Sequence, residues 1–419
     1  MDLKKYKLGD IADFNKRTLN KSDSIKEIIY LDTSSITENV ISDTVTLHVA
    51  DAPSRAQRKV EHYTIIYSTV RPRLKHYGIL KTPSSNLIVS TGFVTIDLKP
   101  EYKGYIDPRY LYLLLTQPSI TEYIGNIADT AVSAYPSINP LDISALSFSF
   151  PEFHIQNRIA DVWENYDQKI ALNRAINDNL EAMAKQLYDY WFVQFDFPNE
   201  EGKPYKSSGG KMVWNNKLKR EIPDGWHCGT LLDIAQYTNG LACQKFRPTD
   251  DNKLPVIKIK EMHDGISSET EFVKSDIPES VKVYDGDVLF SWSASLEVML
   301  WAYGNGGLNQ HIFKVTSNNG YPRSFYFYQL IDYIGNFKRV AEARKTTMGH
   351  ITQDHLKQST IALPPNTNTA NKLEERLSPI FDTIINNSQE IMNLTKQRDE
   401  LLPLLMNGQV SVNYHLSDD

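Results

Sequence analysis

The chain of 419 residues is too long for one ordinary domain and leaves room for two domains of roughly 150 residues each, with additional helix. Its content of 41% hydrophobic and 11% aromatic residues excludes an intrinsically disordered protein. A formal net charge of −6 argues against a protein that coats nucleic acid regardless of sequence, unless basic residues are concentrated in particular segments.

The N-terminal segment MDLKKYKLGDIADF lacks the apolar core of a signal peptide. No later stretch reaches the roughly 20 apolar residues of a membrane span. The two cysteines, Cys228 and Cys243, are too few for a disulfide framework or a zinc site. We therefore expect a cytoplasmic protein with no membrane partner.

Residues 1–150 are expected to form the first globular domain. The β-branched and aromatic runs KEIIYLD, YTIIYSTV and NLIVSTGFVTIDL predict strands, and YLYLLLTQ predicts a helix. This pattern favours a twisted, mostly antiparallel sheet with a few helices. Between residues 53 and 81 only Glu61 opposes a row of basic residues, which are Arg55, Arg58, Lys59, Arg71, Arg73, Lys75 and Lys81.

The basic segment supplies the candidate DNA contacts of this domain. Lysine and arginine hold a protein on phosphates, whereas polar side chains and small apolar tips read base edges. The candidates are Arg55, Arg58, Lys59, Ser68, Thr69, Arg71, Arg73, Lys75, His76 and Tyr77. The alternative interpretation is an ordinary solvated surface loop.

The apolar pattern changes after Pro151, and residues 151–196 predict a long helix. Its apolar positions alternate at spacings of four and three, which is the seam of a coiled coil. The seam residues are Ile159, Trp163, Tyr166, Ile170, Asn173, Asn177, Leu180 and Leu187. Residues 197–221, rich in Gly, Pro, Ser and Lys, are then expected to be an exposed linker.

Residues 222–363 predict a second domain that repeats the first. LGDIA at residues 8–12 recurs as LLDIA at residues 231–235, an offset of 223 (231 − 8). Further matches follow in the same order, with Phe93 over Phe313 at offset 220 and Pro151 over Pro364 at offset 213. Insertions in loops would produce such drifting offsets, so we infer an internal, pseudo-two-fold repeat. Chance similarity between two α/β domains is the alternative.

The second domain has its candidate DNA contacts in different segments. They are Lys245, Arg247, Ser291, Ser293, Gln310, His311, Arg344, Lys345 and His350. The segment SWSASLE, which corresponds to the basic loop of the first domain, is uncharged up to Glu297. If different loops carry the contacts, the two domains read different sequences, and the DNA site is bipartite and asymmetric.

Residues 364–410 predict a second long helix, followed by a tail over 411–419. Its seam residues are Leu373, Leu377, Ile380, Ile384, Asn387, Ile391, Leu394 and Leu401. No compact domain needs two helices of about 40 residues, roughly 60 Å each, for its own core. We therefore expect the two helices to pair as an antiparallel coiled coil that sets the gap between the two half-sites.

Asparagines interrupt the seam at equivalent positions of the two helices. With the helix centres aligned, Asn177 would lie opposite Asn387. A buried asparagine costs stability but fixes the register of such a pair. The alternative is that these asparagines face a solvated groove or a partner protein.

The sequence has no catalytic or metal-binding signature. It lacks a phosphate-binding loop, and its Pro364–Pro365 pair lacks the flanks of an amino-methyltransferase motif. The ten histidines are scattered without ligand spacing. We therefore expect no catalytic residue and no metal site in this chain.

Three segments together resemble the specificity subunit of type I restriction-modification systems, and the resemblance covers essentially the whole chain. They are residues 150–198 with Gln156 at the entry into the first helix, IPDGW at residues 222–226, and GHITQDHLKQSTIALPP at residues 349–365. The second helix begins with PNTNTANKLEERL and lacks a counterpart of Gln156.

This resemblance implies an α+β fold with two mixed α/β target-recognition domains joined by the helix pair. It implies a non-catalytic subunit that binds double-stranded DNA. Two methyltransferase subunits would flank it and methylate adenine with S-adenosylmethionine. The resemblance leaves open whether two restriction subunits, which use ATP and Mg, join them. The helix aromatics Trp163, Tyr188, Tyr190 and Trp191 would serve the methyltransferase interface, or, for Trp163 and Trp191, the packing between the helices.

Two other interpretations stay open on the sequence. One is a single-chain restriction or methylation enzyme whose motifs are dispersed. The other is a coiled-coil adaptor that binds only proteins. Turnover by the isolated chain would distinguish the first, and binding that ignores DNA sequence would distinguish the second.

Overall fold

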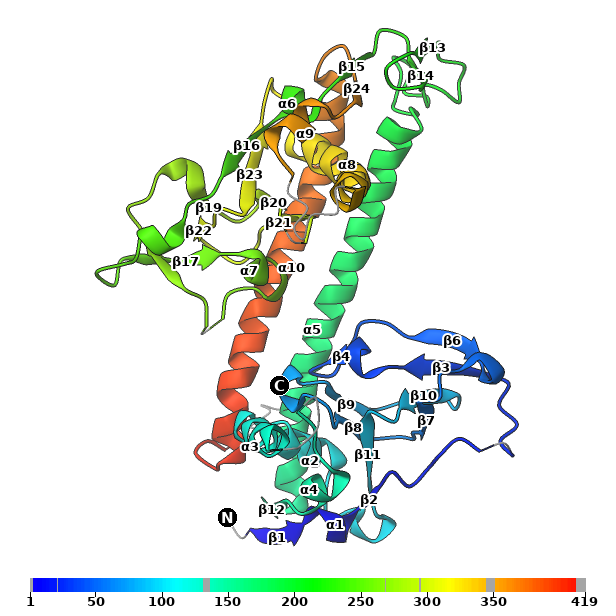
Figure 1. The fold of residues 1–419 in the computed structure, drawn as a ribbon, viewed down its shortest axis with the longest axis vertical. Coiled ribbons are helices and arrows are strands. Elements are labelled where there is room, and N and C mark those ends of the chain that lie inside the picture. Colours follow the sequence, from blue (N-terminus) through cyan, green and yellow to red (C-terminus); the bar gives the residue numbers. More distant parts are fainter. Residues whose placement is uncertain are drawn as a thin grey trace, which may run out of the picture. The chain divides into compact units, whose positions relative to one another are not determined.

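The structure is a computed structural model that describes residues 3–20, 22–130, 136–267, 269–293, 295–343 and 351–411 (Figure 1). The chain divides into two compact units. Unit 1 comprises Met1–Asp167 and Gln397–Asp419, and unit 2 comprises Gln168–Lys396. Each unit contains sheets, short helices and part of two long helices, so the chain has the mixed helix and sheet composition expected from its sequence.

Unit 1 is built on two four-stranded sheets, with strand orders β2-β11-β8-β9 and β6-β3-β10-β7. Its sequence predicted a single sheet. The run NLIVSTGFVTIDL splits at Thr91 and Gly92 into β10 and β11, which belong to different sheets. Its elements are β1 Lys4–Lys7, α1 Leu8–Ile11, β2 Ala12–Phe14, β3 Glu27–Leu31, β4 Ile36–Thr37, β5 Val40–Ile41, β6 Val45–His48, β7 Ala56–Lys59, β8 Thr64–Ser68, β9 Tyr77–Leu80, β10 Leu87–Ser90, β11 Phe93–Leu98, α2 Pro108–Leu115, α3 Pro118–Asp129, α4 Pro140–Ser144 and β12 Ser147–Phe150.

Three strands of unit 1, β8, β9 and β10, are mostly apolar along their whole length because both of their faces are covered. Every residue of β8, β9 and β10 is buried. Helix α2 packs against this core and starts at a defined point, because the Asp107 side chain accepts a hydrogen bond from the Arg109 N–H and Pro108 follows at the first helical position.

Unit 2 repeats this plan with the strand orders β16-β23-β20-β21 and β18-β17-β22-β19. As in unit 1, all but one of the pairings within these two sheets are antiparallel. Its elements are β13 Met212–Asn215, β14 Arg220–Pro223, β15 His227–Gly229, α6 Leu231–Ile234, β16 Ala235–Asn239, β17 Lys253–Ile257, α7 Ile259–Asp264, β18 Phe272–Lys274, β19 Lys282–Val283, β20 Val288–Ser291, β21 Glu297–Leu300, β22 Gly306–Leu308, β23 Ile312–Ser317, α8 Arg323–Ala343, α9 Gln353–Lys357 and β24 Ile361–Leu363.

Strand pairing gives the repeat its register. Ser68 pairs with Phe93 in unit 1, and Ser291 pairs with Ile312 in unit 2. Phe93 therefore corresponds to Ile312 at offset 219 (312 − 93), and the sequence match of Phe93 with Phe313 is wrong by one residue. A shift of one residue would turn every side chain of the strand to the opposite face, so only the ladder fixes the alignment.

The long helices are α5, Phe153–Tyr188, which a π-helical turn at Asp189–Val193 extends, and α10, Asn368–Met406. Every predicted seam residue is buried or half-buried. In unit 2 the Asn387 Nδ2 donates to the Asn177 Oδ1 at 2.9 Å, and the Asn173 Nδ2 donates to Glu390 at 2.9 Å. The structure thus brings Asn177 and Asn387 together. From Asn173 to Asn177 the residue numbers rise along α5, while those of their partners on α10 fall from Glu390 to Asn387.

Except for Phe197, the side chains of residues 197–221 are exposed or half-buried, but the segment also contains regular structure. Strands β13 and β14 pair within this region, and Phe197 is buried with its ring stacked on Trp226 at 5.4 Å between centroids. The Asp196 carboxylate accepts hydrogen bonds from the Ser207 N–H and hydroxyl. The stacking of Phe197 on Trp226 and the hydrogen bonds from Ser207 to Asp196 thus hold this Gly- and Ser-rich segment against the rest of unit 2.

Candidate nucleic-acid interface

Three loops of unit 1 meet at one end of the sheet β2-β11-β8-β9. The Thr69 N–H donates to the Gly92 carbonyl at 2.9 Å, and the Ile138 N–H donates to the Thr69 carbonyl at 2.9 Å. The Thr91 N–H donates to the Arg55 carbonyl at 2.8 Å, which adds the loop before β7. We call Thr69, Thr91 and Gly92 edge 1. Its backbone is fixed, and the exposed Arg55 side chain lies beside it.

Arg73, a predicted DNA contact, is engaged by helix α3 of the same unit. Its guanidinium donates to the Glu122 carboxylate at 3.0 and 3.2 Å, to Asn126 at 2.7 Å and to Asp129 at 2.7 Å. These partners raise the pKa of Arg73, the Glu122 hydrogen bond first. A phosphate would have to displace two carboxylates, so Arg73 serves first to hold its loop on α3.

Other basic candidates of unit 1 also have acidic partners. The Lys75 ammonium lies 2.6 Å from the Glu38 carboxylate, and the Lys59 ammonium lies 2.8 Å from Asp23. Arg58 is half-buried, and desolvation lowers its pKa. The local excess of positive charge read from residues 53–81 is thus smaller in the fold, because acids from other segments are brought beside it.

The remaining candidates of unit 1 divide by exposure. Ser68 and Tyr77 are buried, and burial raises the pKa of the Tyr77 hydroxyl. The His76 Nδ1 lies 2.6 Å from the Ile36 carbonyl oxygen, which holds the ring against the short strand β4. Arg55 and Arg71 are exposed, and Arg71 adopts a left-handed backbone conformation with φ 48°. Arg55 and Arg71 therefore present their side chains to solvent, and the half-buried Thr69 does so in part.

Four polar and aromatic side chains of unit 2 meet at the corresponding end of the sheet β16-β23-β20-β21. The Trp292 Nε1 donates to the Asn239 Oδ1 at 3.0 Å, and the Trp292 and His311 rings lie 5.6 Å apart between centroids. The Gln310 Nε2 lies 3.3 Å from the His311 Nε2. We call Asn239, Trp292, Gln310 and His311 edge 2. It combines hydrogen-bonding side chains with an aromatic surface.

The other candidates of unit 2 are placed differently. Ser291 and Ser293 are buried, and the Ser291 hydroxyl accepts a hydrogen bond from the Glu297 N–H at 3.0 Å. Lys245 and Arg247 are exposed in and after a single 3₁₀ turn at Cys243–Lys245. The predicted contacts Arg344, Lys345 and His350 lie outside the described residues.

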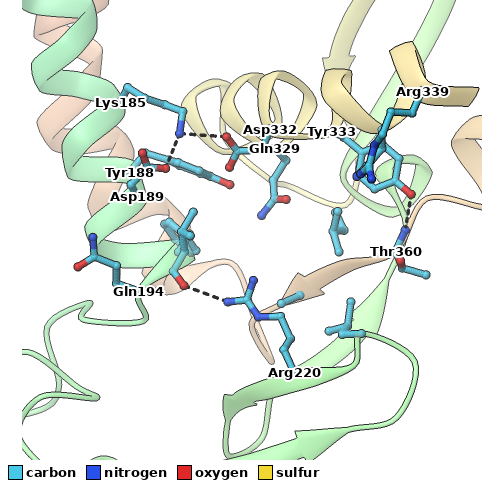
Figure 2. A pocket seen from close by; sticks show the side chains of 16 residues that line it. Lys185, Tyr188, Asp189, Gln194, Arg220, Gln329, Asp332, Tyr333, Arg339 and Thr360 are labelled. Carbon is cyan, nitrogen blue, oxygen red and sulfur yellow. Dashed lines mark hydrogen bonds and ion pairs between the residues drawn. The ribbon is translucent and has the colours of Figure 1, made fainter. Parts of the chain in front are cut away.

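A cavity of about 1070 Å³, lined by both polar and apolar side chains, lies in unit 2 where α5 ends (Figure 2). The Lys185 ammonium is paired with Asp189 and lies 3.0 Å from the Asp332 carboxylate of α8. Burial raises the pKa of the Asp332 carboxyl, although Lys185 opposes that shift. The Arg220 guanidinium on β14 donates to the Val193 carbonyl at 2.9 Å. These bonds fasten the π-helical turn to α8 and to the hairpin.

The helix aromatics face the core. Trp163, Tyr188 and Trp191 are buried, and Tyr190 is half-buried. Tyr188 stacks on Phe192 at 5.5 Å between centroids. The hypothesis that these aromatic side chains bind a methyltransferase is therefore wrong for Trp163, Tyr188 and Trp191, because each side chain is buried inside its own unit. Exposed apolar residues lie elsewhere on α5.

Among the described residues no group of three or more His, Cys, Asp or Glu side chains could hold a metal ion. No helix in that part of the chain has the length and apolar character of a membrane span.

Sequence reasoning missed Asn239 and Trp292. They are 53 residues apart in sequence (292 − 239), and neither stands in a charged segment. In the structure Asn239 ends β16 and Trp292 directly follows β20, but no pattern in the sequence marked either residue as part of a site.

A family model described as the type I restriction modification DNA specificity domain matches residues 1–182 and 223–396. The type I restriction enzyme HindI specificity subunit of Haemophilus influenzae is 24% identical, and the alignment covers 98% of this chain and all of that protein. The MjaIX specificity subunit of Methanocaldococcus jannaschii is 26% identical over 83% of this chain and 78% of that protein. The solved S subunit of the type I system of M. genitalium has the same fold, with a TM-score of 0.57, 13% identity and 96% coverage of both chains.

Proposed function

Because the chain belongs to the type I restriction-modification DNA specificity family, we propose that it is the subunit that reads a bipartite, asymmetric DNA sequence for separate adenine methyltransferase subunits. One observation carries the asymmetry. The two units share their strand order, but the side chains at edge 1 and edge 2 differ in size and chemistry. Equal scaffolds with unequal edges suit two different half-sites.

In this proposal the two long helices act as the spacer between the two DNA-reading units. Paired antiparallel as a coiled coil, they would hold the two half-sites at one distance. Two observations support such a pair: the hydrogen bond between Asn387 and Asn177, and seam residues that are all buried or half-buried. Polar seam positions lower the stability of a coiled coil but admit one register, which a spacer of fixed length requires.

Helix α5 also offers a surface for a methyltransferase subunit. Leu172, Ile176 and Met183 recur on one face and are 61%, 37% and 58% exposed. Aliphatic side chains left in water along one helix face are typical of protein-binding surfaces. We place the methyltransferase here in preference to the buried aromatics. Restriction subunits remain an open addition to the complex.

Catalysis belongs, in this proposal, to the partner chains, together with S-adenosylmethionine, ATP and Mg. The test is a methylation assay on duplex DNA with the chain alone, the methyltransferase alone and both together. We expect sequence-specific adenine methylation only from the mixture. Methyl transfer or cleavage by the isolated chain would show that it is an enzyme.

The reading function is tested by adenine methylation mapped across the genome of the source cell, with and without the gene for this chain. We expect one two-part motif with unequal halves to lose its methylation. A palindromic motif, or an unchanged map, would contradict the proposal. Gel shifts of the complex at several salt concentrations then separate sequence-specific from general binding.

A further inference from the structure

Three of the four residues of edge 2 correspond to the three residues of edge 1, because equivalent backbone hydrogen bonds hold both loops. The Trp292 N–H donates to the His311 carbonyl at 3.3 Å, as Thr69 does to Gly92. The Ile351 N–H donates to the Trp292 carbonyl at 3.0 Å, as Ile138 does to that of Thr69. Trp292 therefore occupies the place of Thr69, and His311 that of Gly92. Gln310 then matches Thr91.

The size difference between the edges has a steric cause in unit 1. A Cβ atom on Gly92 would lie 2.7 Å from the Thr33 methyl group, so the turn after β3 occupies the space that a side chain would need. No such packing limits His311, which is exposed. Since backbone bonds hold both edges, the side chains of edge 2 are not required to close the loop.

The geometry of the sheet presents edge 2 as a group. Strand β23 lies between β16 and β20 and is antiparallel to both. The last residue of β16, the residue after β20 and the residues before β23 therefore lie at the same end of the sheet. Asn239, Trp292, Gln310 and His311 stand at these positions.

The chemistry of edge 2 suits base edges better than phosphates. None of its four side chains carries an ammonium or guanidinium group. The carboxylate at the same end of the sheet, Glu297, lies 3.1 Å from the His263 Nε2. A glutamine side chain can donate to and accept from adenine at once, and a histidine ring can do either with a purine.

We propose that Gln310 and His311 read bases in the half-site of unit 2, and that Trp292 and Asn239 are positioning residues for them. This inference rests on the proposed DNA-reading function. The hydrogen bond from Trp292 to Asn239 fixes the indole, and the indole in turn lies against the His311 ring. Unit 1 has small residues at edge 1, and the exposed Arg55 beside that edge contacts DNA phosphate instead.

The test uses the complex of this chain with its methyltransferase and a library of randomised DNA duplexes. The wild-type complex is expected to select a motif with two parts. Gln310→Ala should select the same motif with the preference lost at one position of one part. Its affinity for the wild-type motif should fall about tenfold to a hundredfold, while binding to unrelated duplex DNA stays unchanged.

Gln236→Ala is the matched control, because Gln236 is an exposed glutamine of β16 in the same unit and lies away from edge 2. It should select the full motif. For the positioning residues, Trp292→Ala should weaken the same part of the motif, and Trp292→Phe should restore part of it by keeping an aromatic ring. Unchanged melting temperatures would show that these variants fold.

Two outcomes would overturn the inference. One is a Gln310→Ala complex that selects the full motif with wild-type affinity. The other is a uniform loss of binding on all duplexes, which would make edge 2 a backbone contact. If the wild-type complex itself selected no motif, the DNA-reading function would fail, and the inference with it.

Discussion

At the scale of single residues, basic side chains of unit 1 that look alike in sequence have different duties. Arg73 is bound by Glu122, Asn126 and Asp129. Arg55 is exposed at the loop that is bonded to edge 1. The number of basic residues in a loop therefore overstates the charge that DNA would meet.

We predict that Arg55→Ala and Arg73→Ala separate these duties. Arg55→Ala should weaken DNA binding by the complex and lower the slope of log affinity against log salt by about 1, because one phosphate contact is lost. Arg73→Ala should leave that slope unchanged and lower the melting temperature of unit 1. Equal salt slopes in the two variants would contradict this assignment.

Lys185 in the cavity of unit 2 compensates two carboxylates. We predict that Lys185→Met destabilises the protein by on the order of 1 kcal/mol at pH 7, a value reduced for partial solvent screening. The control is Lys211→Met, since Lys211 and its partner Asp224 are both exposed, and it should have little effect. Thermal unfolding measures both.

The effect of Lys185→Met should depend on pH in a defined direction. Burial already raises the pKa of Asp332 above its ordinary value of 3.8, and loss of Lys185 should raise it further. An acid with a raised pKa in the folded state destabilises the fold when ionised, so the penalty is full above that pKa and disappears as the pH falls toward 3.8. The melting temperature should therefore drop more at pH 7 than at pH 4.

At the scale of elements, the two long helices carry the same spacing of seam residues but differ at other positions. At offset 214, the positions of Leu172 and Ile176 on α5 correspond to Asn386 and Glu390 on α10. Both α10 residues are exposed and polar. The apolar stripe is therefore a property of α5 alone, and two methyltransferase subunits would meet unequal helix faces.

We predict that Leu172→Lys combined with Met183→Glu releases a methyltransferase subunit from the complex, because it places charge in a contact that the proposal makes apolar. Native mass spectrometry should record a lower methyltransferase-to-chain ratio. Asn386→Lys on α10 is the control and should keep the ratio. Retention of every subunit in the α5 variant would place the docking surface elsewhere.

The asparagine pair can be tested by a double-mutant cycle. Asn387→Leu should destabilise the protein by roughly 1–3 kcal/mol, because the Oδ1 of the buried Asn177 loses the hydrogen bond that the Asn387 amide donates to it. Replacement of both residues by leucine should cost less than the sum of the single changes. Additive losses measured by denaturant unfolding would mean that the two amides act independently.

At the scale of the whole molecule, the end of the chain completes the first unit. Leu402 and Leu405 of α10 belong to the same core as Trp163 and Tyr112. The Gln117 side chain of α2–α3 also contacts Met406, at 3.5 Å from its sulfur. The core of unit 1 therefore depends on residues of α10 that follow the whole of unit 2 in the sequence.

We predict that Leu405→Ala destabilises unit 1 by about 2–4 kcal/mol, because the side chain is 3% exposed and its removal leaves a cavity. Leu404→Ala, at a neighbouring side chain that is 39% exposed, is the matched control and should cost less than about 1 kcal/mol. Calorimetry of the full chain measures both. Equal losses would contradict the packing of this turn.

The sequence by itself determined the repeated plan, the two long helices and the family. Apolar spacing is a local property of the chain, so the seam positions, including Asn177 and Asn387, could be predicted without a structure. Strand runs such as YTIIYSTV were equally local, although their register was not, and one repeat match was wrong by one residue for that reason.

Only the tertiary structure decided which polar side chains share a surface. It brought acids from α3 to Arg73, placed Asn239 beside Trp292, and paired β13 with β14 in a hairpin. Each of these outcomes depends on pairing between segments far apart in sequence. The charge, exposure and hydrogen bonding of a site depend on neighbours that are distant in sequence. The spacing of residues along the chain therefore does not predict them.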